Sequence, residues 1–425
     1  MENLTSKGYK IPIKGNENHM KKLTLYSEVE NVVPGPKPKI ICYKRSKEFL
    51  YLPRYYGILN IGEIVPTKKE EITPINVSFQ GTLRDYQKDI IEKTLENFNT
   101  GPKGGTWSIF TGGGKTSCAL YMITKMNVKT IIIVHKQILL DQWKERIQQF
   151  IPEASIGIIQ GPTIDVEDKD IVIAMVQSLT RKEYPRGLFR TFGFLIVDEV
   201  HTICSKTFSE ALFMIQTKYR LGLSATPKRK DGFDKIFYYH LGPTIVSIHK
   251  TILKPSIRYL FTDTTIPVLM TSFGKMNLPK FITDLSKDSD RNLFIIDTIH
   301  DIMTEENRKM LVFSDRVEQC KTLNNLFSVP NKTSNTFIGK MTKEEKDQAL
   351  LCDVIFATYG ICKEGFDCPS LDTLLFATPK SDVIQAVGRI LRKKNNYEPL
   401  VIDIVDKQLK GQWYCRKKFY NTFKT

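Results

Sequence analysis

The chain has 425 residues, of which 62 are Lys or Arg and 46 are Asp or Glu, so its formal net charge at pH 7 is +16. Its hydrophobic share of 41% excludes disorder over most of the length, and the length suits two or three domains. The positive charge favours a polyanionic partner, either nucleic acid or an acidic membrane surface.

No stretch approaches the roughly eighteen uninterrupted apolar residues that a membrane-spanning helix needs, and residues 1–22 lack the apolar block of a signal peptide. We therefore expect a protein that is neither inserted in a membrane nor secreted. The eight cysteines form no C-x-x-C pair, and the nearest two, Cys362 and Cys368, have no histidine at metal-ligand spacing. We interpret them as thiols of a reducing intracellular compartment rather than as a zinc site.

Residues 1–80 differ in composition from the rest of the chain. Seven prolines punctuate short strand-like pieces such as residues 39–43 and 49–52. This pattern predicts a small β-rich N-terminal domain.

From residue 105 onward, apolar runs rich in β-branched residues alternate with stretches that recur at helical spacing. Runs that are apolar on both faces are typical of central strands in a parallel sheet covered by helices. The strand-like runs are 107–110, 130–134, 171–175, 194–197, 311–313, 354–357, 374–377 and 400–404, and the helical stretches include 117–126, 136–150 and 381–392. The alternation predicts an α/β fold.

The strand-like runs fall into two groups, which predict two sheet domains at residues 81–242 and 285–425. The segment 243–284 between them carries several prolines and weak periodicity, and we expect it to be a linker with adapting structure. With the β-rich domain at 1–80, the sequence therefore predicts four segments.

A glycine-rich turn follows the run at 107–110 and precedes the helical stretch at 117–126. It reads T-G-G-G-K-T and contains Gly112, Gly113, Gly114, Lys115 and Thr116. Glycines let backbone N–H groups close around a phosphate, a lysine reaches the β/γ oxygens and a threonine hydroxyl binds Mg²⁺. Ile109 occupies the first glycine position of the strict pattern, and the alternative interpretation is a plain glycine-rich turn.

Two carboxylates, Asp198 and Glu199, end the run at 194–197. At the carboxyl edge of a parallel sheet they would face the glycine-rich turn. Asp198 could then hold Mg²⁺, and Glu199 could take a proton from the water that attacks the γ-phosphate. Alone, such a pair is more often a helix cap. Together with the upstream turn, the catalytic interpretation is favoured.

Four segments resemble, in sequence and order, motifs I, II, III and VI of superfamily 2 helicases. They are residues 111–116, D-E-V-H at 198–201, S-A-T at 224–226 and Q-A-V-G-R-I-L-R at 385–392. The resemblance covers residues 81–405. It implies two RecA-like parallel-sheet domains in tandem, with ATP in the cleft between them and nucleic acid across their top.

Further segments resemble narrower groups of this superfamily. G-L-S-A-T-P-K-R-K-D-G at 222–232, followed by L-G-P at 241–243, is similar to the XPB/UvsW group of DNA helicases, in which an Arg-x-Asp element follows motif III. Y-L-P-R-Y-Y-G at 51–57, L-R-D-Y-Q at 83–87 and E-G-F-D-C-P at 364–369 resemble the helicases of large cytoplasmic DNA viruses, including the poxvirus transcript-release type.

The resemblance assigns further residues to the nucleotide. Gln87 with Arg84 matches the adenine-reading motif, and an amide can pair with both a ring acceptor and an exocyclic amine, so ATP is the expected nucleotide. Gly365 and Asp367 match motif V of the second domain and are expected at the same site.

Arg389 and Arg392 match motif VI and lie three apart, so one helix face would present both guanidinium groups to one cleft. A guanidinium stabilises the charge of a transferring phosphoryl group, and its supply from the second domain makes hydrolysis depend on closure. Two arginines on a helix are more often a solvated face, but Gln385 and Gly388 complete the motif. The expected catalytic residues are Lys115, Asp198, Glu199, Gln385, Arg389 and Arg392.

The resemblance assigns nucleic acid contact or coupling to His135, Lys136, Gln177, Ser178, Ser224, Thr226, Arg229, Asp231, Ser314 and Thr358. Short polar side chains and backbone N–H groups of this kind contact phosphates. His201 could relay between the nucleotide and motif III, or it could be a structural histidine at a strand end. Ile109, Phe110 and Lys230 depart from the family pattern, which bears on strand separation rather than on ATP hydrolysis.

The sequence therefore predicts a nucleic-acid-dependent ATPase that uses MgATP to move along one strand, 3′ to 5′ as the XPB/UvsW likeness implies. Three activities stay open: a helicase that separates DNA or RNA:DNA hybrid, a translocase that remodels protein–nucleic-acid complexes, and a non-enzymatic nucleic-acid clamp. The expected partners are DNA or RNA and, beyond these, a polymerase or transcription complex. We expect a monomer with no membrane partner, and the viral resemblance implies the host cytoplasm, with the virion as a second location.

Overall fold

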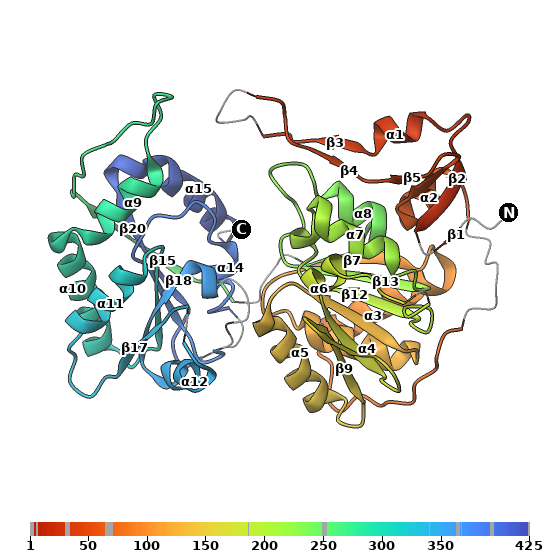
Figure 1. Ribbon diagram of the computed structural model, residues 1–425. Coiled ribbons are helices and arrows are strands. Elements are labelled where there is room, and N and C mark those ends of the chain that lie inside the picture. Colours follow the sequence, from red (N-terminus) through yellow and green to blue (C-terminus); the bar gives the residue numbers. More distant parts are fainter. Residues whose placement is uncertain are drawn as a thin grey trace. The chain divides into compact units, whose positions relative to one another are not determined.

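The computed structural model describes residues 4–5, 7–29, 35–63, 71–185, 187–248, 253–339, 341–362, 366, 368–391 and 395–423. The chain forms two compact units, residues 1–249 and 250–425 (Figure 1).

The first unit is built on a sheet of eight strands, all parallel except β10, which runs antiparallel to β9. In spatial order the strands are β10 (Thr163–Asp165), β9 (Ile156–Gln160), β11 (Ile171–Met175), β8 (Thr130–Val134), β12 (Phe194–Val197), β13 (Tyr219–Ser224), β7 (Gly104–Ile109) and β14 (Thr244–Ile248). Since β12, β13 and β7 are neighbours, the segments that follow them meet at one edge of the sheet.

Helices cover both faces of this sheet (Figure 1). Helices α3 (Asp85–Thr100), α4 (Lys115–Met126) and α5 (Gln137–Phe150) pack on one face, where Trp107, Ile123 and Ile147 are fully buried. Helices α6 (Val176–Arg181), α7 (Lys206–Met214) and α8 (Lys235–Leu241) pack on the other face. A short 3₁₀ turn, Val200–Ile203, follows β12.

The N-terminal part packs on the second of these faces. Strands β1 (Leu4–Thr5), β2 (Gly8–Pro12), β6 (Phe49–Leu52) and β5 (Lys44–Arg45) form one antiparallel sheet, β3 (Thr24–Tyr26) pairs with β4 (Lys39–Ile41), and helices α1 (Asn18–Lys22) and α2 (Arg54–Asn60) accompany them. Tyr9 and Leu52 lie in the same core as Phe237 and Leu241 of α8. A β-rich N-terminal part is therefore present, but it shares its core with the first α/β sheet.

The second unit has a sheet of six parallel strands, in the order β15 (Ser256–Thr262), β20 (Leu400–Asp406), β19 (Thr373–Phe376), β16 (Met310–Ser314), β18 (Val354–Thr358) and β17 (Ser334–Phe337). Its helices are α9 (Leu278–Lys287), α10 (Ser289–Glu305), α11 (Val317–Leu326), α12 (Lys343–Leu351), α13 (Tyr359–Cys362), α14 (Ile384–Val387) and α15 (Lys410–Tyr420), with 3₁₀ turns at Lys407–Leu409 and Asn421–Phe423. Two buried ion pairs, Arg291 with Asp406 and Arg416 with Asp403, each 2.7 Å, tie α10 and α15 to β20.

The fold class predicted from the sequence is confirmed: two parallel-sheet domains in tandem follow a small β-rich N-terminal part. The structure corrects the linker expected at 243–284, because β14 adds to the first sheet and β15 to the second. Pro243 and Pro255 directly precede these strands, and Pro279 lies in the first turn of α9. Proline is tolerated where an element begins, so the prolines mark strand and helix starts here.

The helix expected at 381–392 is also shorter than predicted. Helix α14 ends at Val387, and Arg389 lies in the turns that follow it. The N–H of Gly388 still bonds to the carbonyl of Ile384, but glycine favours an end to the helix here. Arg392 lies outside the described residues, so a shared helix face for the two arginines stays a prediction.

Candidate active site

The glycine-rich turn closes the carboxyl end of β7 and leads directly into α4. Gly112 and Gly114 adopt positive φ angles of 86° and 76°, which side chains other than glycine rarely adopt. A Cβ atom at Gly114 would also lie 2.2 Å from Nε2 of Gln87. The turn and the first N–H groups of the twelve-residue helix α4 form a concave, partly positive end of the kind that binds phosphate.

Lys115 and Gln87 both bond to backbone carbonyls of this turn region. The ammonium of Lys115 donates to the carbonyl of Ile109 at 3.3 Å. The Gln87 amide donates to Gly113 at 3.3 Å, while its Oε1 accepts from the backbone N–H of Arg84 at 2.9 Å. The two adenine-reading candidates therefore lie beside the phosphate turn, at the start of α3.

Tyr86 joins the same group, although sequence reasoning gave it no role. Its hydroxyl donates to the carbonyl of Gly113 at 3.1 Å and accepts from the Arg84 guanidinium at 3.2 Å. The sequence feature that could have indicated this role is the position of Tyr86 between Arg84 and Gln87 in L-R-D-Y-Q.

Asp198 follows β12 and is almost fully buried. The indole N–H of Trp143 donates to its Oδ2 and the backbone N–H of Glu199 donates to its Oδ1, each at 2.9 Å. Burial, and secondly the charge of Glu199, raise the pKa of Asp198 to about 6, whereas Trp143 and the nearby Lys115 lower it. This carboxylate is therefore close to the phosphate turn and would be stabilised by an added cation.

Glu199 has a φ of 47° and a ψ of 57°, which is left-handed backbone. For a residue other than glycine this conformation stores strain of roughly 1–3 kcal/mol, and such strain concentrates at functional sites. The bend starts the turn Val200–Ile203, whose first residue packs against Gly222 of β13.

His201 lies between Glu199 and Ser224, which ends β13. Its Nδ1 is 3.4 Å from Oε2 of Glu199 and 3.3 Å from the hydroxyl of Ser224. Ser224 is fully buried and accepts the N–H of Thr226 at 3.1 Å. These contacts form one chain of polar groups from the catalytic-base candidate to the S-A-T segment, hereafter the coupling chain.

The Arg-x-Asp element joins this chain. The guanidinium of Arg229 donates to the backbone carbonyl of His201 at 2.7 Å and to Oδ1 of Asp231 at 2.9 Å. The side-chain hydrogen bond with Arg229 is the main cause that lowers the pKa of Asp231, so this carboxylate stays ionised. Lys230 between them does not prevent the pairing.

The strand-top candidates of the first unit lie together. Gln177 in α6 donates to the carbonyl of His135 at 2.7 Å, and the hydroxyl of Ser178 accepts the N–H of Gly161 at 2.9 Å. Lys136 is the residue directly before α5. The segments after β8 and β11 are thus linked at the same sheet edge, because these strands are neighbours.

In the second unit, Ser314 and Thr358 end the neighbouring strands β16 and β18. The hydroxyl of Ser314 donates to Gln319 at 2.7 Å, and the next residue, Asp315, pairs with Lys380 at 2.7 Å. Gln385 and Arg389 are both buried.

The Arg389 guanidinium donates to the carbonyl of Phe366 and so links the motif VI segment to the motif V segment. Gly365, Asp367 and Arg392 lie outside the described residues. Their assignments stay predictions.

Comparison with known proteins places the chain in a family. Residues 80–229 match the family described as type III restriction enzyme, res subunit. The protein named "Putative ATP-dependent RNA helicase L396" of Acanthamoeba polyphaga mimivirus is 31% identical over 403 residues, which cover 89% of this chain and 76% of the relative. The chain belongs to the superfamily 2 helicases. It is a nucleic-acid-dependent ATPase of the helicase class.

Two further relatives place this helicase on the XPB-like branch with viral members. The protein named "DNA 3'-5' translocase XPB2" of Sulfurisphaera tokodaii is 30% identical over 376 residues, which cover 76% of this chain and 82% of the relative. The protein named "Putative helicase 161L" of Invertebrate iridescent virus 6 is 27% identical over 419 residues and covers 91% of each chain.

The described part of this helicase contains neither a membrane-spanning helix nor a cluster of metal ligands. No helix in that part has the length and apolar character to cross a bilayer. Within the same residues, no cluster of three His, Cys, Asp or Glu side chains is arranged to hold a metal ion, and the cysteines 42, 118, 204, 320, 352, 368 and 415 are free thiols.

Proposed function

We propose that this helicase uses MgATP to move 3′ to 5′ along one strand and to separate a DNA duplex or an RNA:DNA hybrid. The coupling chain carries the proposal, because it connects the base that would activate water to the S-A-T segment through His201 and Ser224. Hydrolysis of the γ-phosphate would thereby change the contacts of the S-A-T segment, which we expect to couple the nucleotide to the strand. Two relatives named as an RNA helicase and a DNA 3′–5′ translocase support a strand substrate and this direction.

The residues at the turn fit Mg²⁺ and triphosphate. Thr116 and Asp198 offer hydroxyl and carboxylate oxygens, which are the ligands that Mg²⁺ prefers. A bound cation would counter the burial and the Glu199 charge that raise the pKa of Asp198. When bound, the ion neutralises charge on the phosphates. Lys115 would hold the β/γ oxygens in the cradle of Gly112, Gly113 and Gly114, and Arg84 with Gln87 would hold the adenine.

Glu199 would accept the proton of the attacking water and pass the change in charge to His201. Because the imidazole lies within 3.4 Å of both Glu199 and Ser224, it can respond to the protonation of one and shift its contact with the other. This gives His201 the relay role, with Thr226, Arg229 and Asp231 as the receiving segment.

The second unit would complete the reaction. Arg389 and Arg392, with Gln385, would stabilise the charge of the transferring phosphoryl group, and Gly365 and Asp367 would contact the nucleotide. His135, Lys136, Gln177 and Ser178 in the first unit, and Ser314 and Thr358 in the second, would contact the strand backbone. A monomer acting on a viral transcription complex is the setting that we propose.

A strand-displacement assay on tailed duplexes of DNA, RNA and hybrid tests the proposal. We expect displacement from 3′-tailed DNA or hybrid that needs ATP and Mg²⁺, that is lost in Lys115→Ala, and that is lost in Glu199→Gln although this variant still binds ATP. Hydrolysis stimulated by single strands without any displacement would favour the non-unwinding translocase. Unimpaired hydrolysis by Glu199→Gln would refute the base assignment.

A further inference from the structure

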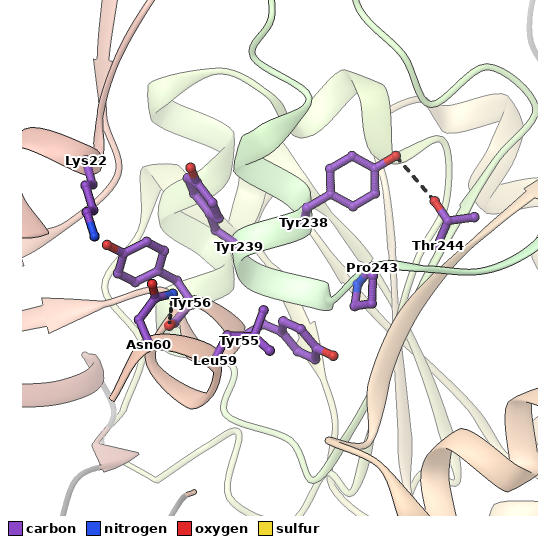
Figure 2. A pocket seen from close by; sticks show the side chains of 9 residues that line it. All are labelled: Lys22, Tyr55, Tyr56, Leu59, Asn60, Tyr238, Tyr239, Pro243 and Thr244. Atoms are coloured by element: carbon purple, nitrogen blue, oxygen red, sulfur yellow. Dashed lines mark hydrogen bonds between the residues drawn. The ribbon is translucent and has the colours of Figure 1, made fainter. Parts of the chain in front are cut away.

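A pocket of about 640 Å³ lies in the first unit between the N-terminal helices and α8 (Figure 2). Four of its nine lining residues are tyrosines, and we name it the tyrosine pocket. Its lining residues are Lys22 of α1, Tyr55, Tyr56, Leu59 and Asn60 of α2, Tyr238 and Tyr239 of α8, and Pro243 and Thr244. The segment Y-L-P-R-Y-Y-G at 51–57, to which the proposed function assigns no role, supplies two of the tyrosines.

The tyrosine pocket is separate from the phosphate turn. Pro243 and Thr244 lie beside the amino end of β7, where a Cβ atom at Gly104 would be 3.5 Å from the ring of Tyr55. The phosphate turn follows the carboxyl end of the same strand, Gly104–Ile109. Thr244 pairs with Thr106 and Tyr55 lies beside Gly104, so at about 3.3 Å per residue the strand separates the pocket from the phosphate turn by roughly 10–17 Å.

The walls of the pocket are already fixed in place. The hydroxyl of Tyr56 lies 2.9 Å from Nδ1 of His19, and its ring meets that of Tyr239 edge to face at 5.1 Å. Asn60 donates to the carbonyl of Tyr56 at 2.9 Å, and the hydroxyls of Tyr238 and Thr244 are 3.4 Å apart, as the dashed lines in Figure 2 show. A site whose side chains are ordered beforehand loses less entropy when it binds.

Close packing also fixes α2 against the N-terminal sheet. A Cβ atom at Gly57 would lie 2.2 Å from the ring of Tyr9, so only glycine allows this approach. The hydroxyl of Tyr9 in turn donates to the carbonyl of Gly62 at 3.0 Å. Tyr55 and Tyr56 therefore have a set position relative to α8.

The lining selects a flat ligand with negative charge. Tyrosine rings offer planar apolar walls with polar edges, and burial raises the pKa of Tyr55, Tyr56 and Tyr239, so their hydroxyls stay protonated. The ammonium of exposed Lys22 disfavours a cationic ligand. Residues 1–63 contain 11 Lys or Arg against 6 Asp or Glu, a net charge of +5, which favours an anion at the rim.

The size of the pocket fits one nucleotide unit rather than a duplex. Its volume of about 640 Å³ lies within the range of roughly 300–1,000 Å³ of small-ligand sites. Leu59 is 67% exposed at its rim, so a chain can continue from the pocket into solvent. Bases taken out of a stack bind proteins by stacking on aromatic side chains.

We propose that the tyrosine pocket binds one unstacked base of a nucleic acid strand, with Lys22 paired to a neighbouring phosphate. The pocket thus gives this helicase a second strand contact, remote from the ATP site. The inference needs no ATP hydrolysis, so it can fail or hold independently of the proposed function.

Binding of the full-length protein to a fluorescent single-stranded oligothymidylate, without ATP and at fixed salt, tests the proposal. We expect Tyr238→Ala to weaken binding about tenfold, the scale of one stacked base, and Tyr238→Phe to keep most of it. Tyr26→Ala removes the same kind of ring from an exposed position of β3, outside the pocket, and is the control for loss of a tyrosine ring. Equal affinities of Tyr238→Ala and Tyr26→Ala would overturn the proposal.

Two neighbouring lysines give a charge-matched comparison. Lys21 and Lys22 are both exposed, but only Lys22 lines the pocket. We expect Lys22→Glu to weaken binding several times more than Lys21→Glu, because only Lys22 lines the pocket. Both substitutions change the net charge equally, so a difference between them reports on the pocket. The same loss in both variants would mean that only the general positive field attracts the strand, and the proposal would be wrong.

Photo-crosslinking of the unmodified protein avoids any question of folding. With an oligonucleotide that carries 5-iodouracil, we expect adducts on Tyr55, Tyr238 or Tyr239, retained in Lys115→Ala and suppressed by unlabelled oligonucleotide. Adducts confined to the segments after β8, β11 and β13 would overturn the pocket assignment. Equally strong competition by a free mononucleotide would show a small-molecule site and would overturn the strand assignment.

Discussion

Trp143 stabilises the ionised form of Asp198, the carboxylate that we assign to Mg²⁺. Its indole N–H is one of two donors to Asp198, at 2.9 Å. A donor to the ionised form lowers the pKa of a carboxyl group, so its removal raises the pKa of Asp198 above the value of about 6. Because Mg²⁺ requires the ionised carboxylate, we expect Trp143→Phe to move the acid limb of the pH profile of kcat/KM for ATP to higher pH.

Trp413→Phe is the control for loss of an indole N–H, since Trp413 lies on α15 of the second unit, where its ring meets that of Tyr259 at 6.0 Å. The rate of ATP hydrolysis would be measured for both variants from about pH 5 to pH 8 with saturating Mg²⁺. An acid limb that stays in place in Trp143→Phe would mean that the indole does not govern the protonation of Asp198.

Among single residues, the sequence predicted those whose side-chain type alone indicates a chemical role. Lys115 after three glycines and Asp198 with Glu199 after an apolar run could be proposed from the sequence, because phosphate and metal binding need these groups at these places. The donors Trp143 and Tyr86 were not found, because each acts through a contact that only the folded chain makes. The left-handed backbone of Glu199 has no signal in the side-chain pattern at all.

Helix α8 packs on the first sheet through a buried titratable side chain, His240, that has no opposite charge paired with it among the described residues. His240 is fully buried, neither of its ring nitrogens has a hydrogen-bond partner among the described residues, and its ring meets Phe213 edge to face at 4.7 Å. Burial, and then the charges of Arg220 and Lys44, hold the pKa of His240 well below 6.5. The neutral ring is therefore required for α8 to stay packed.

The sign of the pH effect follows from this lowered pKa. The unfolded chain takes up the proton near pH 6.5 and the folded chain does not, so stability is present above about pH 6.5 and falls as the pH is lowered from there. Each pKa unit of difference corresponds to about 1.4 kcal/mol. We expect amide exchange in residues 235–248, corrected for intrinsic rates, to lose protection below about pH 6.5, and His240→Phe to retain it.

Residues 295–303 of α10 serve as an internal control for this measurement, since they lie in the second unit far along the chain. An equal loss of protection in both segments and in both proteins would attribute the pH effect to general acid unfolding. It would remove His240 from the explanation.

Strands of the two sheets were predictable where both faces are apolar. All eight runs coincide with β7, β8, β11, β12, β16, β18, β19 and β20. β13 was missed because Arg220 and Gly222 interrupt its pattern, yet Arg220 is fully buried and donates to the carbonyls of His240 and Ile215. β9, which lies next to the edge strand β10, alternates buried with half-buried positions, and the edge strand β17 buries only Phe337, which weakens the same signal.

On the scale of the whole molecule, the proposed chemistry is divided between two units with separate cores. Lys115, Asp198 and Glu199 lie in the first unit, whereas Arg389 lies in the second, and the chain division falls at residue 249. Arg389 is not among the residues that we assign to hold ATP. A mutation of Arg389 can therefore separate ATP binding from ATP hydrolysis. The buried arginine also has a structural contact, with the carbonyl of Phe366, that must be controlled for.

Arg389→Ala should therefore separate the two steps. We expect ATP hydrolysis to fall about 10³-fold, the lower scale for a catalytic arginine, while the Kd of a fluorescent ATP analogue changes only a few-fold. Arg258→Ala, which removes an exposed arginine from β15 of the same unit, is the control for charge. Thermal unfolding of both variants tests whether loss of the Phe366 contact weakens the unit. Normal hydrolysis in Arg389→Ala, or a parallel loss of ATP binding, would contradict the division of roles, because a group that stabilises only the transferring phosphoryl acts on turnover alone.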